Sequence, residues 1–326
     1  MDANDEAAVN PAPIQDGLAA GSRHRGSPQP HAMVYADAHF RMGSAHADEG
    51  TPCQDYAVSG HGPGRLPFAI VSDGCSSSGR TDLGARVLAL GAAKVLRTYG
   101  ALSATALRDS VLNATVAASM LLGLEPRDMD ATLGIALALP GGGVRAMLLG
   151  DGVIAARTPD GLDVRTVDWA GNMPGYPWYM LSPSCREEFL SMSRAAAAAG
   201  GRAPCLVTRF LIGPDGSVEQ VSVDGLDAAE GLEGTVAEWL PGDGAGAPDS
   251  VSVMTDGALQ FSGGATGAEV ASALATFKAA REGEFVRRRM SRALGGFARR
   301  GCHPVDDIAA AAVAAAVQPW GDGQGV

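Results

Sequence analysis

Three apolar runs in this chain stop at an aspartate followed by a glycine. They read AIVSDG, AMLLGDG and VSVMTDG, and each resembles a buried strand up to its acidic residue. Two more strand-like runs carry acidic residues where they begin, in CQDYAV and VDDIAAAAV. A turn explains a single Asp-Gly pair, but it explains a set less well, because Asn, Ser or Gly would serve a turn equally. The aspartates concerned are Asp55, Asp73, Asp151, Asp256, Asp306 and Asp307.

A bound cation is the other explanation for these carboxylates. If they gather at one edge of a sheet, they repel one another unless a positive ion lies among them. Ligation by oxygen alone suits magnesium, manganese or calcium rather than zinc. A glycine after the aspartate also lets the backbone approach an ion or its waters closely. The pattern therefore indicates hard cations, whose usual use in such a cluster is phosphate chemistry.

Charge and composition exclude several other classes of protein. Among 326 residues, 25 are basic and 36 acidic, which gives a net charge of -11. This balance argues against general binding to nucleic acid or to an anionic membrane surface. No apolar stretch has the length of a membrane span. The five cysteines are scattered without paired spacing, which favours free thiols in a reducing compartment over a zinc site. We expect a soluble cytoplasmic protein.

The chain divides into one domain and two tails. Residues 1–30 and 318–326 are poor in large apolar groups, so we expect the N-terminal segment to be disordered and the C-terminal one to be a similar tail. Residues 31–317 form one domain of strand blocks that alternate with helix pairs, which predicts helices layered on packed antiparallel sheets, an α+β fold. The predicted helices are 81–99, 104–122, 267–280 and 284–299. The predicted strands are 34–41, 55–59, 67–72, 131–138, 145–149, 153–157, 162–167, 205–212, 218–223, 251–255 and 308–317.

Five motifs in a fixed order connect the aspartates to a known family. GSAHADEGTPCQDYA, AIVSDG, ATLGIALAL with MLLGDG, VMTDG and VDDIAAAAV resemble, in this order, the motifs of the metal-dependent protein phosphatases. These are the type-2C serine/threonine phosphatases, and the likeness is to their bacterial branch, which GNMPGYPWYMLS also resembles. The resemblance spans about residues 31–317. It implies a four-layer α-β-β-α sandwich, with two antiparallel sheets flanked by helix pairs and a metal site at one end.

The resemblance also implies a role for each aspartate. Asp73 would bridge two Mg²⁺ or Mn²⁺ ions with help from the backbone of Gly74, and a water between the ions would attack phosphoserine or phosphothreonine. In such pairs the ions lie about 3.5–4 Å apart. The expected catalytic residues are Asp73, Asp55 and His46. The expected metal ligands are Asp73, Gly74, Asp256, Asp306, Asp55 through water, and Asp151 at a third, weaker position.

The chain departs from the family pattern where substrate phosphate is normally bound. The family's arginine before the first aspartate is missing, and Gly50 lies near its place. His46 is the nearest polar candidate, either as a phosphate ligand and proton donor or as an ordinary loop histidine. Arg41 and Arg80 are the other candidates. After the central aspartate, Cys75 replaces the frequent His or Met, which leaves a general acid unassigned there.

Two smaller departures and two competing functions remain. Gln54 stands where many members carry glutamate, and Asp307 where asparagine is usual. The first hypothesis is an enzyme that acts on phosphoproteins and opposes a partner serine/threonine kinase. The alternative is a catalytically weak phosphatase-fold regulatory or binding protein, which the missing arginine favours. A calcium-stabilised structural module is a third class, but it leaves the order of the motifs unexplained.

Overall fold

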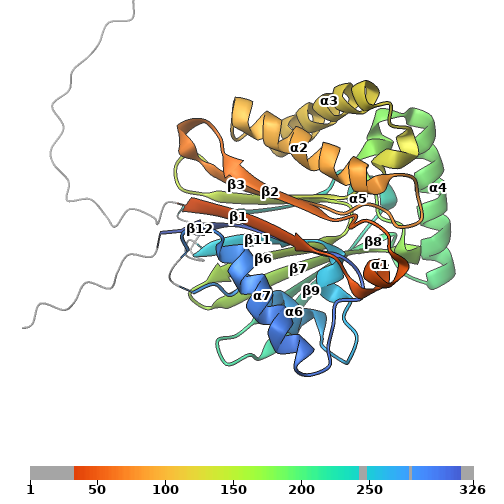
Figure 1. Cartoon of the computed structure of the whole chain (residues 1–326). Coiled ribbons are helices and arrows are strands. Elements are labelled where there is room, and N and C mark those ends of the chain that lie inside the picture. The colour runs from red at the N-terminus through yellow and green to blue at the C-terminus, as the bar shows by residue number, and fades with distance from the viewer. Residues whose placement is uncertain (1–32, 242–247, 279–280, 317–326) are drawn as a thin grey trace, which may run out of the picture.

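Several strands are buried along their whole length, which requires a packed layer on each of their faces. β3 (Pro67–Ser72), β4 (Leu133–Ala138) and β12 (Ile308–Ala315) contain buried residues only. The computed structural model describes residues 33–241, 248–278 and 281–316 and places these strands at non-edge positions of two stacked sheets (Figure 1). The two predicted tails, at 1–30 and 318–326, lie outside the described residues.

Every pair of neighbouring strands in the two sheets is antiparallel. The seven-stranded sheet has the order β1-β12-β11-β6-β7-β8-β9, and the five-stranded sheet has the order β10-β5-β4-β3-β2. The remaining strands are β1 (Met33–Arg41), β2 (Tyr56–His61), β5 (Val144–Leu149), β6 (Gly152–Thr158), β7 (Gly161–Trp169), β8 (Cys205–Ile212), β9 (Val218–Leu226), β10 (Thr235–Trp239) and β11 (Ser250–Met254).

Helices cover the outer face of each sheet. α2 and α3 lie over the five-stranded sheet, whereas α6 and α7 lie against the seven-stranded sheet (Figure 1). No helix within the described ranges is both long and apolar enough to span a membrane. The helices are α1 (Ser44–Glu49), α2 (Thr81–Tyr99), α3 (Ala104–Leu122), α4 (Pro183–Gly200), α5 (Ala228–Leu232), α6 (Gly267–Ala275) and α7 (Phe285–Ala298), with short 3-10 turns η1 (Pro63–Arg65), η2 (Pro126–Met129), η3 (Ala170–Asn172), η4 (Pro177–Leu181) and η5 (Asp256–Leu259).

The alternation of side chains along β12 shows how the layers meet. Successive residues of a strand point to opposite faces. Ala309, Ala311 and Val313 therefore pack between the two sheets, while Ile308 and Ala310 pack under α6 and α7. The same alternation in β3 places its other face under α2. Three apolar layers thus separate four layers of secondary structure, which confirms the predicted α-β-β-α sandwich.

Some elements were not predicted. α4 begins after Ser182, whose side chain accepts a hydrogen bond from the Cys185 N–H, and only a narrow stripe of it is buried, including Phe189 and Leu190. Its alanine-rich second half carries too weak an apolar pattern to be recognised. β10 is a five-residue edge strand, and α1 and α5 are shorter than two turns. Tertiary packing rather than local pattern determines such short elements. In the other direction, α6 ends at Ala275 rather than at 280, because Thr276 adopts an extended conformation.

Candidate metal and active site

The aspartates at the strand ends lie together at one end of the sandwich. Asp73 follows β3, Asp151 occupies the turn between β5 and β6, Asp256 follows β11 and Asp306 precedes β12. β11 and β12 run antiparallel, with Met254 opposite Ala310, so the end of one strand and the start of the other share an edge. These four side chains line one pocket of about 210 Å³.

Burial and mutual repulsion dominate the electrostatics of the pocket. Burial raises the pKa of Asp55, Asp73 and Asp151 well above 3.8. Charge repulsion from neighbouring aspartates raises it further, although a hydrogen bond with Asp73 lowers the pKa of Asp55. The pKa values of Asp256 and Asp306 are raised as well, mainly by burial. No lysine or arginine of the described ranges is among the main influences on these five groups. The described residues therefore form a concentrated acidic site to which no lysine or arginine brings a main counter-charge.

Asp55 has one carboxylate oxygen held and the other without a partner. Thr255 Oγ1 donates to Asp55 Oδ2 at 2.7 Å, and the same hydroxyl accepts the Ala309 N–H at 2.9 Å. Asp55 Oδ1 is buried and has no hydrogen-bond partner. A buried, unpartnered carboxylate oxygen is costly unless a proton or a cation satisfies it. This oxygen, together with the all-oxygen donor set around it, fits a hard metal ion.

The glycines of two Asp-Gly pairs are required by close packing rather than by a turn. Neither Gly74 nor Gly257 has a positive φ, whereas Gly152, after Asp151, does at 131°. A Cβ on Gly257 would lie 1.7 Å from the Asp307 carbonyl oxygen, and one on Gly74 would lie 2.6 Å from the Thr81 carbonyl oxygen. At these two positions glycine lets neighbouring backbone segments approach closely. The turn explanation therefore holds for only one of the three pairs.

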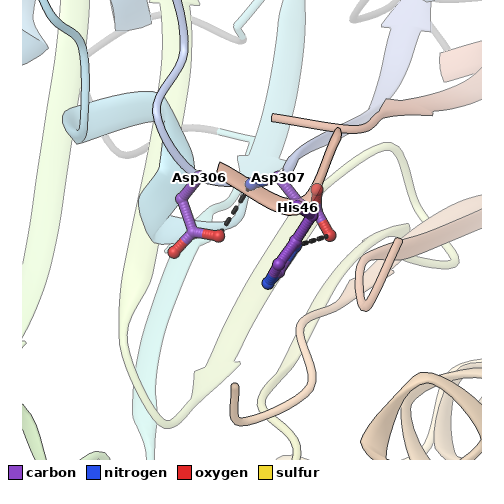
Figure 2. Close-up of side chains that lie close together, drawn as sticks. All are labelled: His46, Asp306 and Asp307. Carbon is purple, nitrogen blue, oxygen red and sulfur yellow. Dashed lines mark hydrogen bonds and ion pairs between the residues drawn. The ribbon is translucent and has the colours of Figure 1, made fainter. Parts of the chain in front are cut away.

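Asp307 joins the first motif to the last strand. Its Oδ1 accepts the Gly43 N–H at 2.8 Å and its Oδ2 accepts the Gln54 N–H at 2.7 Å. His46 Nδ1 lies 2.8 Å from Asp307 Oδ2, at an angle that fits an ion pair and not a hydrogen bond. Figure 2 shows the imidazole beside this carboxylate, with its other nitrogen pointing away from Asp307. One possible ligand atom from each of His46, Asp306 and Asp307 lies within 4.8 Å of the others.

The candidate phosphate-binding residues are not gathered in the pocket. Arg80 Nη2 forms an ion pair with Asp128 Oδ2 at 2.7 Å, and Arg41 is exposed at the end of β1. Neither these arginines nor His46 is among the pocket's described lining residues. Cys75 does line it, with its thiol 3.3 Å from the Ser77 hydroxyl.

From the sequence, Asp307 is only a departure from the family pattern. Its role as an acceptor for two backbone N–H groups was not predicted. Its partners Gly43 and Gln54 lie 264 and 253 residues away in the chain. No local pattern reports a contact of that separation. The only signal available was the doubled aspartate itself.

The comparisons with known proteins agree with the fold. The protein phosphatase 2C family model matches residues 42–295, which is well over half of the chain. The chain belongs to the protein phosphatase 2C family and is a protein phosphatase by that membership. The comparison with curated proteins gave no match.

Solved structures that are similar to this chain come from bacterial phosphatases. A variant of a bacterial serine phosphatase is 10% identical, with 88% of this chain and 99% of that one covered and a TM-score of 0.51. The serine/threonine phosphatase Stp1 from Staphylococcus aureus is 10% identical, with 92% and 100% covered and a TM-score of 0.48. The Mycobacterium tuberculosis serine/threonine phosphatase PstP/Ppp is 15% identical, with 87% and 100% covered and a TM-score of 0.47. At 10% identity and a TM-score of 0.51, the first of these shows a likeness of fold alone.

Removing the Asp307 carboxylate should destabilise the protein. We predict that Asp307→Ala lowers the free energy of unfolding by about 2 kcal/mol, because two backbone N–H groups lose their acceptor. Urea denaturation measures the effect. Asp48→Ala, at an exposed position of α1, is the control and should change the midpoint little. Equal midpoints for the two variants would contradict the role of Asp307 as a clamp.

The metal-free protein should become less stable as the pH rises. The site carboxyls have pKa values above the ordinary value of 3.8 in the fold, so the folded state holds protons that the unfolded chain releases. Their contribution is therefore complete below 3.8 and is lost as the pH passes through the raised values. With chelator present, we predict a higher melting temperature at about pH 5.5 than at about pH 7.5.

One substitution separates this effect from other titrations. Asp73→Asn should raise the melting temperature of the metal-free protein at about pH 7.5 and reduce its dependence on pH, because one repelling charge is removed. The exposed Asp160→Asn, in the turn between β6 and β7, is the matched control and should do neither. If Asp73→Asn melts like the control at both pH values, repulsion does not govern the site.

Proposed function

We propose that this phosphatase hydrolyses phosphoserine and phosphothreonine in proteins and that it uses two Mg²⁺ or Mn²⁺ ions for this reaction. One observation carries the proposal: four strand-end aspartates line a single pocket without a lysine or arginine among its described lining residues. A second observation supports it, since the buried Asp55 Oδ1 lacks a hydrogen-bond partner. A site of this composition needs a cation before it can be stable at neutral pH.

The residues present fit hard cations. Asp73 with the Gly74 backbone would hold both ions, and Asp256 and Asp306 would complete one of the two sites. Asp55 would act through water and Asp151 at a third, weaker position. All these donors are oxygens, as magnesium and manganese prefer. Such ions, when bound, lower the pKa of a coordinated water and offset the charge of the phosphoryl oxygens.

Neighbouring side chains orient the carboxylates. The Thr255 hydroxyl fixes one oxygen of Asp55, and Gln260 Nε2 donates to Asp256 Oδ2 at 2.6 Å. The second bond leaves the other carboxylate oxygen of Asp256 for the pocket, whereas Asp55 is buried and is not among the described lining residues. Carboxylates held in this way keep their geometry when the substrate arrives, so less reorganisation is needed in the transition state.

His46 takes the part of the missing arginine in this proposal. Its Nδ1 faces the Asp307 carboxylate, which leaves Nε2 to meet the substrate as a donor. In this role the imidazole would contact the phosphate or give a proton to the leaving oxygen. The alternative candidate Arg80 is already paired with Asp128.

The cellular setting belongs to the same proposal. All five cysteines are free, three of them buried, which suits the reducing cytoplasm. The substrates would be cytoplasmic phosphoproteins, and the physiological counterpart would be a serine/threonine kinase that phosphorylates them.

Activity should require both added metal and Asp73. Metal-stripped protein should not hydrolyse a phosphothreonine peptide until Mn²⁺ or Mg²⁺ is added. We predict that Asp73→Asn lowers kcat/KM by about a thousandfold, because several kcal/mol of charge stabilisation is lost and each 1.36 kcal/mol is about tenfold in rate. Asp160→Asn is the control and should keep full activity.

Other outcomes decide between the hypotheses. Turnover retained in Asp73→Asn contradicts the two-metal assignment. Metal binding by calorimetry without any turnover supports instead the phosphatase-fold binding protein.

Loss of His46 should weaken substrate binding. We predict that His46→Ala raises the KM for phosphate esters by about tenfold, since one hydrogen bond to a charged group is worth about 1.5–3 kcal/mol. Steady-state kinetics on p-nitrophenyl phosphate measure this. His303→Ala, at an exposed histidine three residues before Asp306, is the matched control. An unchanged KM in His46→Ala removes this histidine from the substrate site.

A further inference from the structure

A second pocket adjoins the acidic one. It has a volume of about 350 Å³ and lies between the 75–78 loop, the segment 172–179 and α4. The two pockets share five lining residues, which form their common wall: Cys75, Ser77, Asn172, Pro174 and Tyr176. A peptide whose phosphorylated side chain enters the acidic pocket therefore passes beside the second one.

The walls of the second pocket are mostly aromatic and flexible. The ring centroids of Tyr176 and Tyr179 lie 5.5 Å apart, and those of Tyr179 and Phe189 lie 5.0 Å apart. Met173 and Met192 complete this surface, with Met192 half exposed on α4. Aromatic faces attract cations, and methionine adapts to the shape of whatever packs against it. Such a surface suits a long side chain that has an apolar stem.

Two carboxylates also line this pocket, and no described cation pairs with them. Asp130 is half-buried, and its Oδ2 accepts a hydrogen bond from the Ser78 hydroxyl at 2.7 Å. Burial raises the pKa of its carboxyl. Glu188 is exposed on α4 at the rim, and no ion pair joins it to a described residue. A cationic group in this pocket would be attracted by the half-buried Asp130 and by Glu188 at the rim.

We propose that this second pocket, defined by Asp130, Tyr176, Tyr179, Glu188 and Met192, binds an arginine or lysine side chain that flanks the phosphorylated residue of the substrate. The proposal rests on the proposed function, because the acidic pocket must receive the phosphorylated side chain. In an extended peptide each residue advances by about 3.3 Å, so the basic residue lies within about two residues of the phosphorylated one.

Charge excludes the other kinds of side chain. An apolar side chain would pack on the rings but would leave the half-buried Asp130 further from water without a counter-charge. An acidic side chain would meet two carboxylates here and the aspartate cluster next door. Only a basic side chain places its stem on the aromatic surface and its charged end on the carboxylates.

Binding of peptide analogues tests the proposal without depending on turnover. The peptides carry a phosphonate analogue of phosphothreonine and have Arg, Leu, Ala or Glu at each position within two residues of it. Their Kd values are measured by fluorescence anisotropy on the full chain with Mn²⁺. We expect Arg to bind about tenfold more tightly than Ala at one position or two, because tenfold is about 1.4 kcal/mol, close to the lower value for one hydrogen bond to a charged group. Glu should bind more weakly than Ala.

Variants assign the preference to this pocket. Asp130→Asn combined with Glu188→Gln should reduce the ratio of Ala to Arg Kd values to about one, because two neutral amides no longer favour a cation. The exposed Glu187→Gln on α4, whose side chain does not line the pocket, is the matched control and should keep the tenfold ratio. Equal Kd values for Arg and Ala, or a preference for Leu that survives in the double variant, would overturn the proposal.

Hydrolysis of p-nitrophenyl phosphate, measured in parallel, tests the proposed function separately. This ester carries no flanking residue, so its turnover does not require a basic side chain in the second pocket. If the ester is hydrolysed but the Arg and Ala peptides bind equally, the proposed role of the second pocket is wrong and the phosphatase reaction is supported. No turnover with a tenfold Arg preference would reject the reaction and support the pocket.

Discussion

Mutual repulsion among buried carboxylates is the interaction on which the site depends. Asp73, Asp151, Asp256 and Asp306 come from separate strand ends and line one small pocket, and burial raises the pKa of each of them. Taking several carboxylates out of water is unfavourable unless protons or cations neutralise them. The described part of the chain brings no lysine or arginine to the pocket. The fold thus provides a place whose carboxylates must be neutralised by protons or, as we propose, by a cation from solution.

Small residues and buried hydrogen bonds hold these carboxylates in place. β12 is almost entirely alanine and valine, so both sheets and the helix pair beneath can approach it closely. The Thr255 hydroxyl then reaches Asp55 on one side and the Ala309 N–H on the other. Asp307 ties the first motif to the same strand through Gly43 and Gln54. The site is therefore supported by the central strands and not by loops alone.

The sequence predicts the strand-end aspartates and the layered fold well, because both leave local patterns. Apolar runs that end in Asp-Gly indicate strand and boundary together, and five motifs in order indicate the family. The contacts of Asp307 could not be predicted, since they depend on sheet order rather than on neighbours in the chain. The pairing of Arg80 with Asp128, through the turn before β4, is likewise a tertiary event. α4 escaped prediction because its buried stripe is narrow and its second half is a run of alanine.

The second pocket also depends on tertiary packing that local sequence patterns do not predict. The aromatic residues of the segment GNMPGYPWYMLS could form part of the core or line a substrate site, and the local pattern does not decide between the two. In the structure Tyr176 is buried and yet lines both pockets, so the aromatic cluster serves as core and wall together. α4 supplies the opposite wall through Phe189, Glu188 and Met192. Without α4 in the predicted fold, this pocket could not have been anticipated.

Calorimetric titration of the metal-free chain with Mn²⁺, in two buffers of different ionisation enthalpy, tests the central claim most directly. Raised pKa values mean that the metal-free site holds more protons than ordinary aspartates would at the same pH, and these protons must leave when an ion binds. The account predicts saturable binding of more than one ion per chain, with an observed heat that depends on the buffer because protons are released. An absence of saturable binding, or binding with no proton release near neutral pH, would contradict it.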